Sequence, residues 1–83
     1  MRILYFARIR QIAGKMAEDV EVPETVTTVG GLMDFLSARD DAVASALADR
    51  RTIRVAINQE HSSLDASLAG AREVAFFPPV TGG

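Results

Sequence analysis

The chain has 83 residues, 48% of them hydrophobic, a formal net charge of −2 and no cysteine. This length predicts one small domain, the composition excludes a disordered chain, and the charge disfavours a nucleic-acid binder. With no disulfide, no apolar run of roughly 18 residues and no signal peptide, we expect a cytoplasmic protein that does not bind membranes.

The first quarter of the chain predicts a hairpin with a short helix in its connection. Residues 1–7 alternate as a strand, and residues 15–22 alternate more weakly as a second strand that pairs with the first. Residues 7–13 are expected to form a helical turn that ends at Gly14. Three residues of this turn are spaced to dock on the core: Ile9, Ile12 and Ala13.

Residues 25–39 give the strongest helix pattern, with Thr28 as its N-cap. Its apolar stripe consists of Val29, Leu32, Met33 and Leu36. Gly30 and Gly31 weaken the first turn, and we expect their missing side chains to allow close approach to the sheet. A phosphate-binding loop is disfavoured because no G-K-[ST] sequence follows them.

A second short helix is predicted through Asp49, with Asp40 or Asp41 as its cap. Arg50 and Arg51 then follow near its carboxyl end, where their positive charges would interact favourably with the negative end of the helix dipole.

The last third of the chain predicts a strand at residues 52–58, a turn at 58–61 and an edge segment around Ser63. A closing strand follows at residues 73–77.

The element order predicts an α+β fold of the β-grasp kind, with a mixed sheet of four to five strands. One main helix and short helices would cover one face. The first and last strands are the most apolar, so we expect them side by side and parallel in mid-sheet. The predicted domain spans residues 1–77, and residues 78–83 form an extended, flexible tail.

Catalytic or metal-binding groups are few. His61 is the sole histidine and falls in a predicted turn, where a polar surface role is the more common one. Ser62 and Ser63 lack the G-x-S-x-G context of a nucleophile. We therefore expect no metal site and no catalysis by this chain alone.

Two features are left to carry function. Four residues should meet on the outer face of the sheet: Leu4, Phe6, Ala75 and Phe77. Either a loop or the short helices cover this face, or it is an exposed docking patch, which is the interpretation we favour. Pro78 and Pro79 end the last strand and should lead from this patch into the tail. The final pair, Gly82 and Gly83, is thin enough to enter a narrow site on another protein.

The chain resembles the small subunits of molybdopterin synthase, which are ubiquitin-like sulfur carriers. The matching segments are ILYFARIRQIAG near the start, VAINQ in the middle and EVAFFPPVTGG at residues 73–83. The resemblance implies a β-grasp fold and a carrier whose reactive group is the Gly83 carboxylate. In that family the carboxylate is adenylated and then converted to a thiocarboxylate.

The resemblance also implies partners. A MoeB-like activating enzyme would use ATP, while the chain itself would bind no cofactor. A MoaE-like large subunit would accept the tail, formed by Val80, Thr81 and the glycine pair, and pass the sulfur to cyclic pyranopterin monophosphate. Leu4, Phe6, Ala75, Phe77, Pro78 and Pro79 would dock on these partners. The assembly implied is a heterotetramer of two small and two large subunits.

The chain departs from the family pattern at two places. Residues 69–72 (AGAR) replace an acidic turn, which puts a local salt link to the partners in doubt. His61 stands where an apolar member of the patch is expected, so it would soften the patch or make it sensitive to pH. Two alternatives are left open: a thiamine-type sulfur carrier, and an interaction module whose tail has no role.

Overall fold

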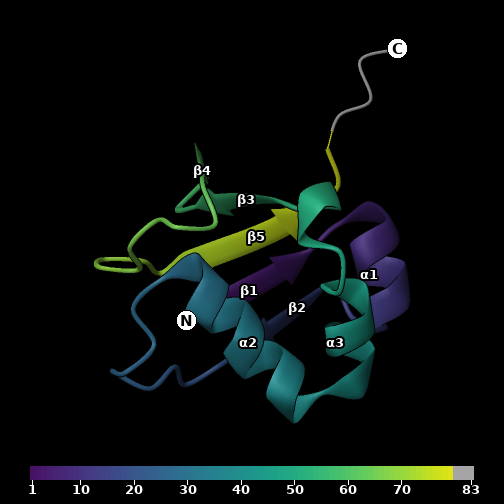
Figure 1. Ribbon diagram of the computed structural model, residues 1–83, viewed down its shortest axis with the longest axis horizontal. Helices are drawn as coiled ribbons and strands as arrows, with labels where there is room; N and C mark the ends of the chain where they lie inside the picture. The colour runs from purple at the N-terminus through teal and green to yellow at the C-terminus, as the bar shows by residue number, and fades with distance from the viewer. Residues whose placement is uncertain (80–83) are drawn as a thin grey trace.

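The first and last strands of the chain lie side by side at the centre of a five-stranded sheet (Figure 1). This computed structural model describes residues 1–79. Strand β1 (Arg2–Tyr5) runs parallel to β5 (Glu73–Phe77), with Ile3 opposite Val74 and Tyr5 opposite Phe76. The predicted parallel pair of central strands is therefore confirmed.

The remaining strands extend this pair on both sides. Strand β2 (Ala17–Asp19) is antiparallel to β1, β3 (Arg54–Ile57) is antiparallel to β5, and β4 (Glu60–Ser62) forms the far edge. The strand order is β2-β1-β5-β3-β4, a mixed sheet as expected.

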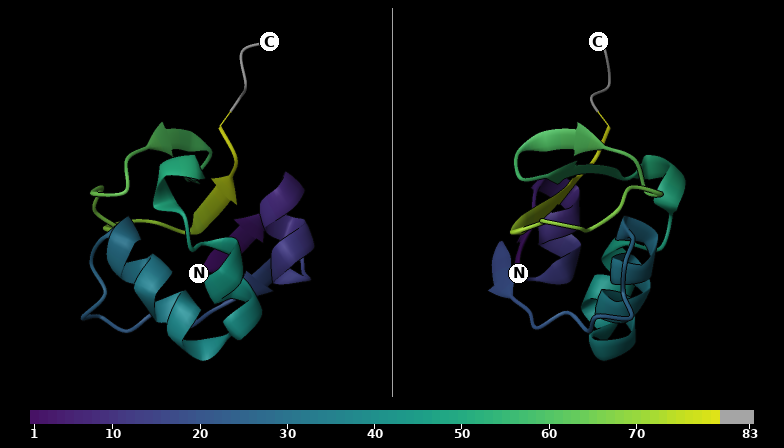
Figure 2. Two further views of the ribbon diagram at one scale, coloured as in Figure 1. Left: turned by 45° about the vertical axis from the view of Figure 1, so that its right-hand side comes forward. Right: turned by 90° about the vertical axis from the view of Figure 1, so that its left-hand side faces the viewer.

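The helices lie on one side of this sheet (Figure 2). They are α1 (Ala7–Ala13), α2 (Val29–Arg39) and α3 (Asp41–Ala46), with a short 3-10 turn, η1 (Arg50–Thr52), before β3. A mixed sheet with its central strands parallel and its helices on one face is the predicted α+β architecture. The β-grasp fold is confirmed.

The core fills the space between the helices and the inner face of the sheet. Its fully buried large residues are Ile3, Tyr5, Val29, Leu32, Met33, Leu36, Val43, Val55, Val74 and Phe76. The Tyr5 hydroxyl donates a 2.7 Å hydrogen bond to Glu18 Oε2 at the edge of this core. Burial, and then this bond, raise the pKa of Tyr5 well above its ordinary value, so the hydroxyl stays protonated as a donor.

Two predicted helix ends are confirmed. Thr28 caps α2, its Oγ1 accepting a 3.1 Å hydrogen bond from the Gly31 backbone N–H. Gly14 ends α1 at a φ of 77°, and its N–H donates to the Arg10 carbonyl at 2.9 Å. These local signals position both helices.

Two expectations about helix packing are wrong. Ile12 is 42% exposed, because a helix of only seven residues presents Ile9 and Ala13 to the core and leaves Ile12 on its flank. A Cβ on Gly30 would make ordinary contacts at 3.5 Å with Leu64 and Arg50 outside the sheet, so close approach to the sheet does not require this glycine.

Two further expectations fail around β3. Helix α3 ends at Ala46, so Arg50 and Arg51 lie beyond it, in η1, and do not interact with its dipole as expected. Instead, Arg50 forms an ion pair with Asp34, and Arg51 forms one with Asp49. The expected four-residue turn at 58–61 is also wrong, and the edge segment expected around Ser63 and Leu64 is present but lies earlier, as β4 at Glu60–Ser62. A two-residue turn joins β3 to β4, because Asn58 and Gln59 adopt positive φ values of 50° and 70°.

Candidate functional site

The outer face of the sheet brings the predicted docking residues together. Leu4 on β1 lies directly opposite Ala75 on β5, which in turn lies opposite Ala56 on β3. His61 on β4 continues this row at the edge of the sheet, opposite Ala56. Four adjacent strands thus each contribute one residue to a continuous row, and its two middle members are alanines.

Larger side chains surround these alanines and leave a shallow hollow of about 410 Å³. We call it the outer hollow. It is lined by Leu4, Phe6, Ala56, Gln59, His61, Glu73, Ala75 and Phe77. The short methyl groups of Ala56 and Ala75 form its floor, so the site is shaped to accept an apolar side chain from another molecule.

Phe6 and Phe77 are the two phenylalanines of the outer hollow. Phe6 is 46% exposed at the point where β1 passes into α1, and its N–H donates to the Phe76 carbonyl at 3.1 Å. The next residue, Ala7, has a φ of 52°, an unfavourable conformation for a residue with a side chain. This bond and this turn fix the backbone that presents Phe6.

His61 contacts the other aromatic side chain directly. Its ring meets that of Phe77 edge to face, at 5.3 Å between centroids and 85° between planes. The histidine is thus an aromatic wall of the hollow, and its position in the edge strand β4 leaves it exposed.

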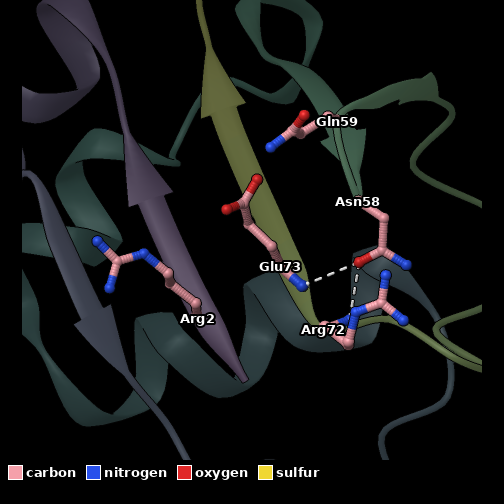
Figure 3. A pocket seen from close by; sticks show the side chains of 5 residues that line it. All are labelled: Arg2, Asn58, Gln59, Arg72 and Glu73. Carbon is pink, nitrogen blue, oxygen red and sulfur yellow. Dashed lines mark hydrogen bonds between the residues drawn. The ribbon is translucent and has the colours of Figure 1, made fainter.

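A polar hollow of about 390 Å³ adjoins the outer hollow at the start of β5 (Figure 3). It is lined by Arg2, Asn58, Gln59, Arg72 and Glu73, of which Gln59 and Glu73 also line the outer hollow. The Asn58 side chain binds the chain just before and at the start of β5. Its Oδ1 accepts from the N–H groups of Arg72 at 2.8 Å and Glu73 at 3.1 Å, and its Nδ2 donates to the Gly70 carbonyl at 3.1 Å.

Sequence reasoning found four residues of the outer hollow from the strand patterns, and the family resemblance added His61. Ala56, Gln59 and Glu73 had not been assigned to the patch. The alternation of residues 52–58 carried the signal for Ala56, which points outward between the inward-facing Val55 and Ile57. The alternation along β5 carried the same signal for Glu73, which shares a face with Ala75 and Phe77. Gln59 depended on the two-residue turn, which no local pattern specified.

The predicted tail lies mostly outside the described residues. Pro78 and Pro79 follow β5 directly and are partly buried. Val80, Thr81, Gly82 and Gly83 lie beyond the part of the chain that the structure describes, so their expected roles are still predictions. Within residues 1–79, no group of three or more His, Cys, Asp or Glu side chains is arranged to hold a metal ion. No helix in that range is long and apolar enough to cross a membrane.

Comparison with known proteins agrees with this fold. The chain matches the model of the ThiS family over residues 3–83. It is 41% identical over 83 residues to the molybdopterin synthase sulfur carrier subunit of Escherichia coli (strain K12), covering 100% of this chain and 99% of that protein. The corresponding subunit of Haemophilus influenzae is 32% identical, with the same coverage.

A solved structure shares the fold. The crystal structure of small archaeal modifier protein 1 from Haloferax volcanii superimposes with a TM-score of 0.74 at 30% identity, over 95% of each chain. The sequence family, the full-length relatives and the architecture all agree, and the protein belongs to the ThiS family.

Proposed function

We propose that this protein is the sulfur carrier of molybdopterin synthesis and that the Gly83 carboxylate carries the sulfur. The proposal is supported by full-length identity to subunits that bear this function in their names. It is supported equally by the continuity of β5. That strand contributes Glu73, Ala75 and Phe77 to the outer hollow and passes directly into Pro78.

This continuity is the observation that carries the proposal. Because Phe77 is both a wall of the hollow and the last residue of β5, a protein that docks on the hollow is brought beside the start of the tail. Pro78 and Pro79 favour an extended backbone and donate no N–H, which directs the chain away from the sheet. Docking thus places residues 80–83 within reach of the partner.

The proposed chemistry begins with activation of a poor acyl donor. A Gly83 carboxylate oxygen attacks the α-phosphorus of ATP on the activating enzyme, which forms an acyl-adenylate and releases pyrophosphate. A sulfide-level sulfur donor then attacks the acyl carbon and displaces AMP, leaving a thiocarboxylate. The chain has no cysteine, so this terminal group would supply the sulfur nucleophile that its side chains lack.

The proposed acceptor lies in a second protein. We infer that the large subunit of molybdopterin synthase binds the outer hollow and takes in residues 80–83. Each thiocarboxylate delivers one sulfur to cyclic pyranopterin monophosphate, and hydrolysis of the acyl–sulfur bond returns the Gly83 carboxylate. Two charged carriers are therefore needed to build one dithiolene. Two glycines at the end would pass through a narrow channel without steric conflict. We further propose a heterotetramer of two small and two large subunits, located in the cytoplasm.

The alternatives make different predictions about the tail. A thiamine-type carrier would also act through Gly83 but would serve another acceptor, and the molybdopterin names of the full-length relatives disfavour it. An interaction module would bind through the outer hollow without using the tail.

Adding one alanine after Gly83 distinguishes carriers from modules. The reactive carboxylate would be displaced by one residue, so we expect sulfur transfer to the pterin to be lost while the fold and binding of the large subunit persist. Circular dichroism and a binding assay are the controls. Unchanged sulfur transfer by the extended chain would contradict the carrier mechanism.

A further inference from the structure

Among the acidic residues without an ion pair in the described chain, Glu73 differs from the others in being partly buried. Seven of the acidic side chains in residues 1–79 take part in no ion pair within that range: Asp19, Glu21, Glu24, Asp41, Glu60, Asp65 and Glu73. Six of the seven are exposed to water, whereas Glu73 is partly buried. An unpaired carboxylate is usually left in water, so its place in a hollow calls for a partner.

The surroundings of Glu73 fix its backbone and leave its side chain free. Its N–H donates to Asn58 Oδ1 at 3.1 Å, and its carbonyl accepts from the Asn58 N–H at 2.9 Å. The nearest cross-strand cation is Arg2, which lies opposite Glu73 in the β1–β5 register. Figure 3 shows the Arg2 guanidinium pointing away from Glu73, and no ion pair within residues 1–79 joins them. The backbone of Glu73 is therefore fixed, while its carboxylate has no cation partner within residues 1–79.

Docking would change the environment of this group. Glu73 lines the outer hollow together with Ala75 and Phe77, so any protein that covers these residues also removes water from the carboxylate. A carboxylate that loses its water without gaining a cation or hydrogen-bond donors opposes binding. A partner that binds tightly on this face must therefore supply such a group.

We propose that Glu73 is a specificity-determining residue of the docking surface and pairs with a basic side chain of the partner. An arginine suits the site, because its planar guanidinium binds a carboxylate through two hydrogen bonds. The partner is thus a protein surface with an apolar side chain for the alanine floor and a cation beside it. This inference rests on the proposed docking of the large subunit at the outer hollow.

The test compares the affinity of the large subunit from the same organism for the full chain and for Glu73→Gln. The amide keeps the shape of the side chain and removes its charge. We expect the variant to bind roughly tenfold or more weakly at low salt, and the deficit to shrink as salt rises. Glu60→Gln is the matched control, since it removes an exposed carboxylate from the edge strand β4 and should leave the affinity unchanged.

The sign of the effect is decisive. If Glu73→Gln binds as well as the unmodified chain, or more tightly, the carboxylate has no cation opposite it and the inference is wrong. Arg2→Gln tests whether this chain provides the cation itself on docking; a loss equal to that of Glu73→Gln would overturn the proposal.

A third variant separates this inference from the proposed function. If Phe77→Asp abolishes binding while Glu73→Gln does not weaken it, the docking face stands and only the role of Glu73 is refuted. If Phe77→Asp binds normally, the outer hollow is not the interface, and the proposed docking and the proposed role of Glu73 both fail, while the sulfur chemistry at Gly83 is tested separately by the alanine extension. Circular dichroism on each variant confirms that the domain is folded.

Discussion

At the scale of single residues, Phe77 has the most consequential position. It is the last residue of β5, a wall of the outer hollow and the residue against which His61 packs at 5.3 Å. The alternation along β5 turns Phe76 fully into the core and Phe77 to the opposite face. Phe76 therefore contributes to the core, whereas Phe77 is available on the outer face to contact a partner.

Phe77→Asp should weaken binding of the large subunit by about 2 kcal/mol or more, roughly thirtyfold, because an aromatic anchor is replaced by a charge in an apolar hollow. Arg10→Asp is the control, since Arg10 is exposed on α1 and does not line the outer hollow. Isothermal titration calorimetry measures both. Equal losses for the two variants would contradict a docking role for the hollow.

The residue scale also shows where sequence reasoning ends. The pairing of Leu4 with Ala75 follows once β1 and β5 are neighbours, and alternation alone orients both side chains outward. The place of His61 could not be predicted in this way. It depends on Asn58 and Gln59 both taking positive φ, without the glycine that usually marks such a turn.

At the scale of elements, Asp40 connects three segments. Its Oδ1 accepts from the N–H groups of Ala42 and Val43 and so caps α3, directly after α2 ends at Arg39. Its Oδ2 accepts a 2.8 Å hydrogen bond from Lys15, just beyond α1. The Lys15 bond, then the backbone N–H donors, hold the pKa of Asp40 below its ordinary value, and the same carboxylate raises the pKa of Lys15.

This arrangement predicts a dependence of stability on acid. A carboxyl whose pKa is lowered by folding stabilises the fold fully above its unfolded pKa of about 3.9, and the contribution is lost as pH falls through the lower folded value. Asp40→Asn should therefore lose less stability than the unmodified chain between about pH 6 and pH 3. Urea unfolding across this range measures the difference.

The control for this experiment is Asp65→Asn, which changes an exposed aspartate that takes part in no ion pair within residues 1–79. Its acid profile should follow that of the unmodified chain. If Asp40→Asn shows the same loss as the unmodified chain, Asp40 does not contribute to the acid sensitivity of the fold.

The elements themselves were largely predictable. Local signals gave the bounds of α1 and β5 and the cap of α2, because a left-handed glycine, an alternating apolar run and a threonine cap act over a few residues. The exposure of Ile12 and the pairing of Arg50 with Asp34 were not predictable. Both depend on how α1 and η1 pack against distant segments, which no local pattern contains.

At the scale of the whole molecule, the two faces of the sheet have separate roles. The helices lie on the inner face (Figure 2), where they cover the buried core. Small and aromatic side chains form the hollow on the outer face. Because β5 is central, it takes part in both, and the tail begins where it ends. We propose that the fold acts as a holder and that the reactive group is the Gly83 carboxylate, beyond the residues that the structure describes.

The measurement that tests this account most directly is the intact mass of the chain after incubation with ATP, a sulfur donor and the cognate activating enzyme. The account predicts the mass increase of one oxygen-for-sulfur exchange, located at Gly83 by fragmentation and absent when ATP is omitted. An unchanged mass with an activating enzyme proven active, or an exchange at any other residue, would contradict it.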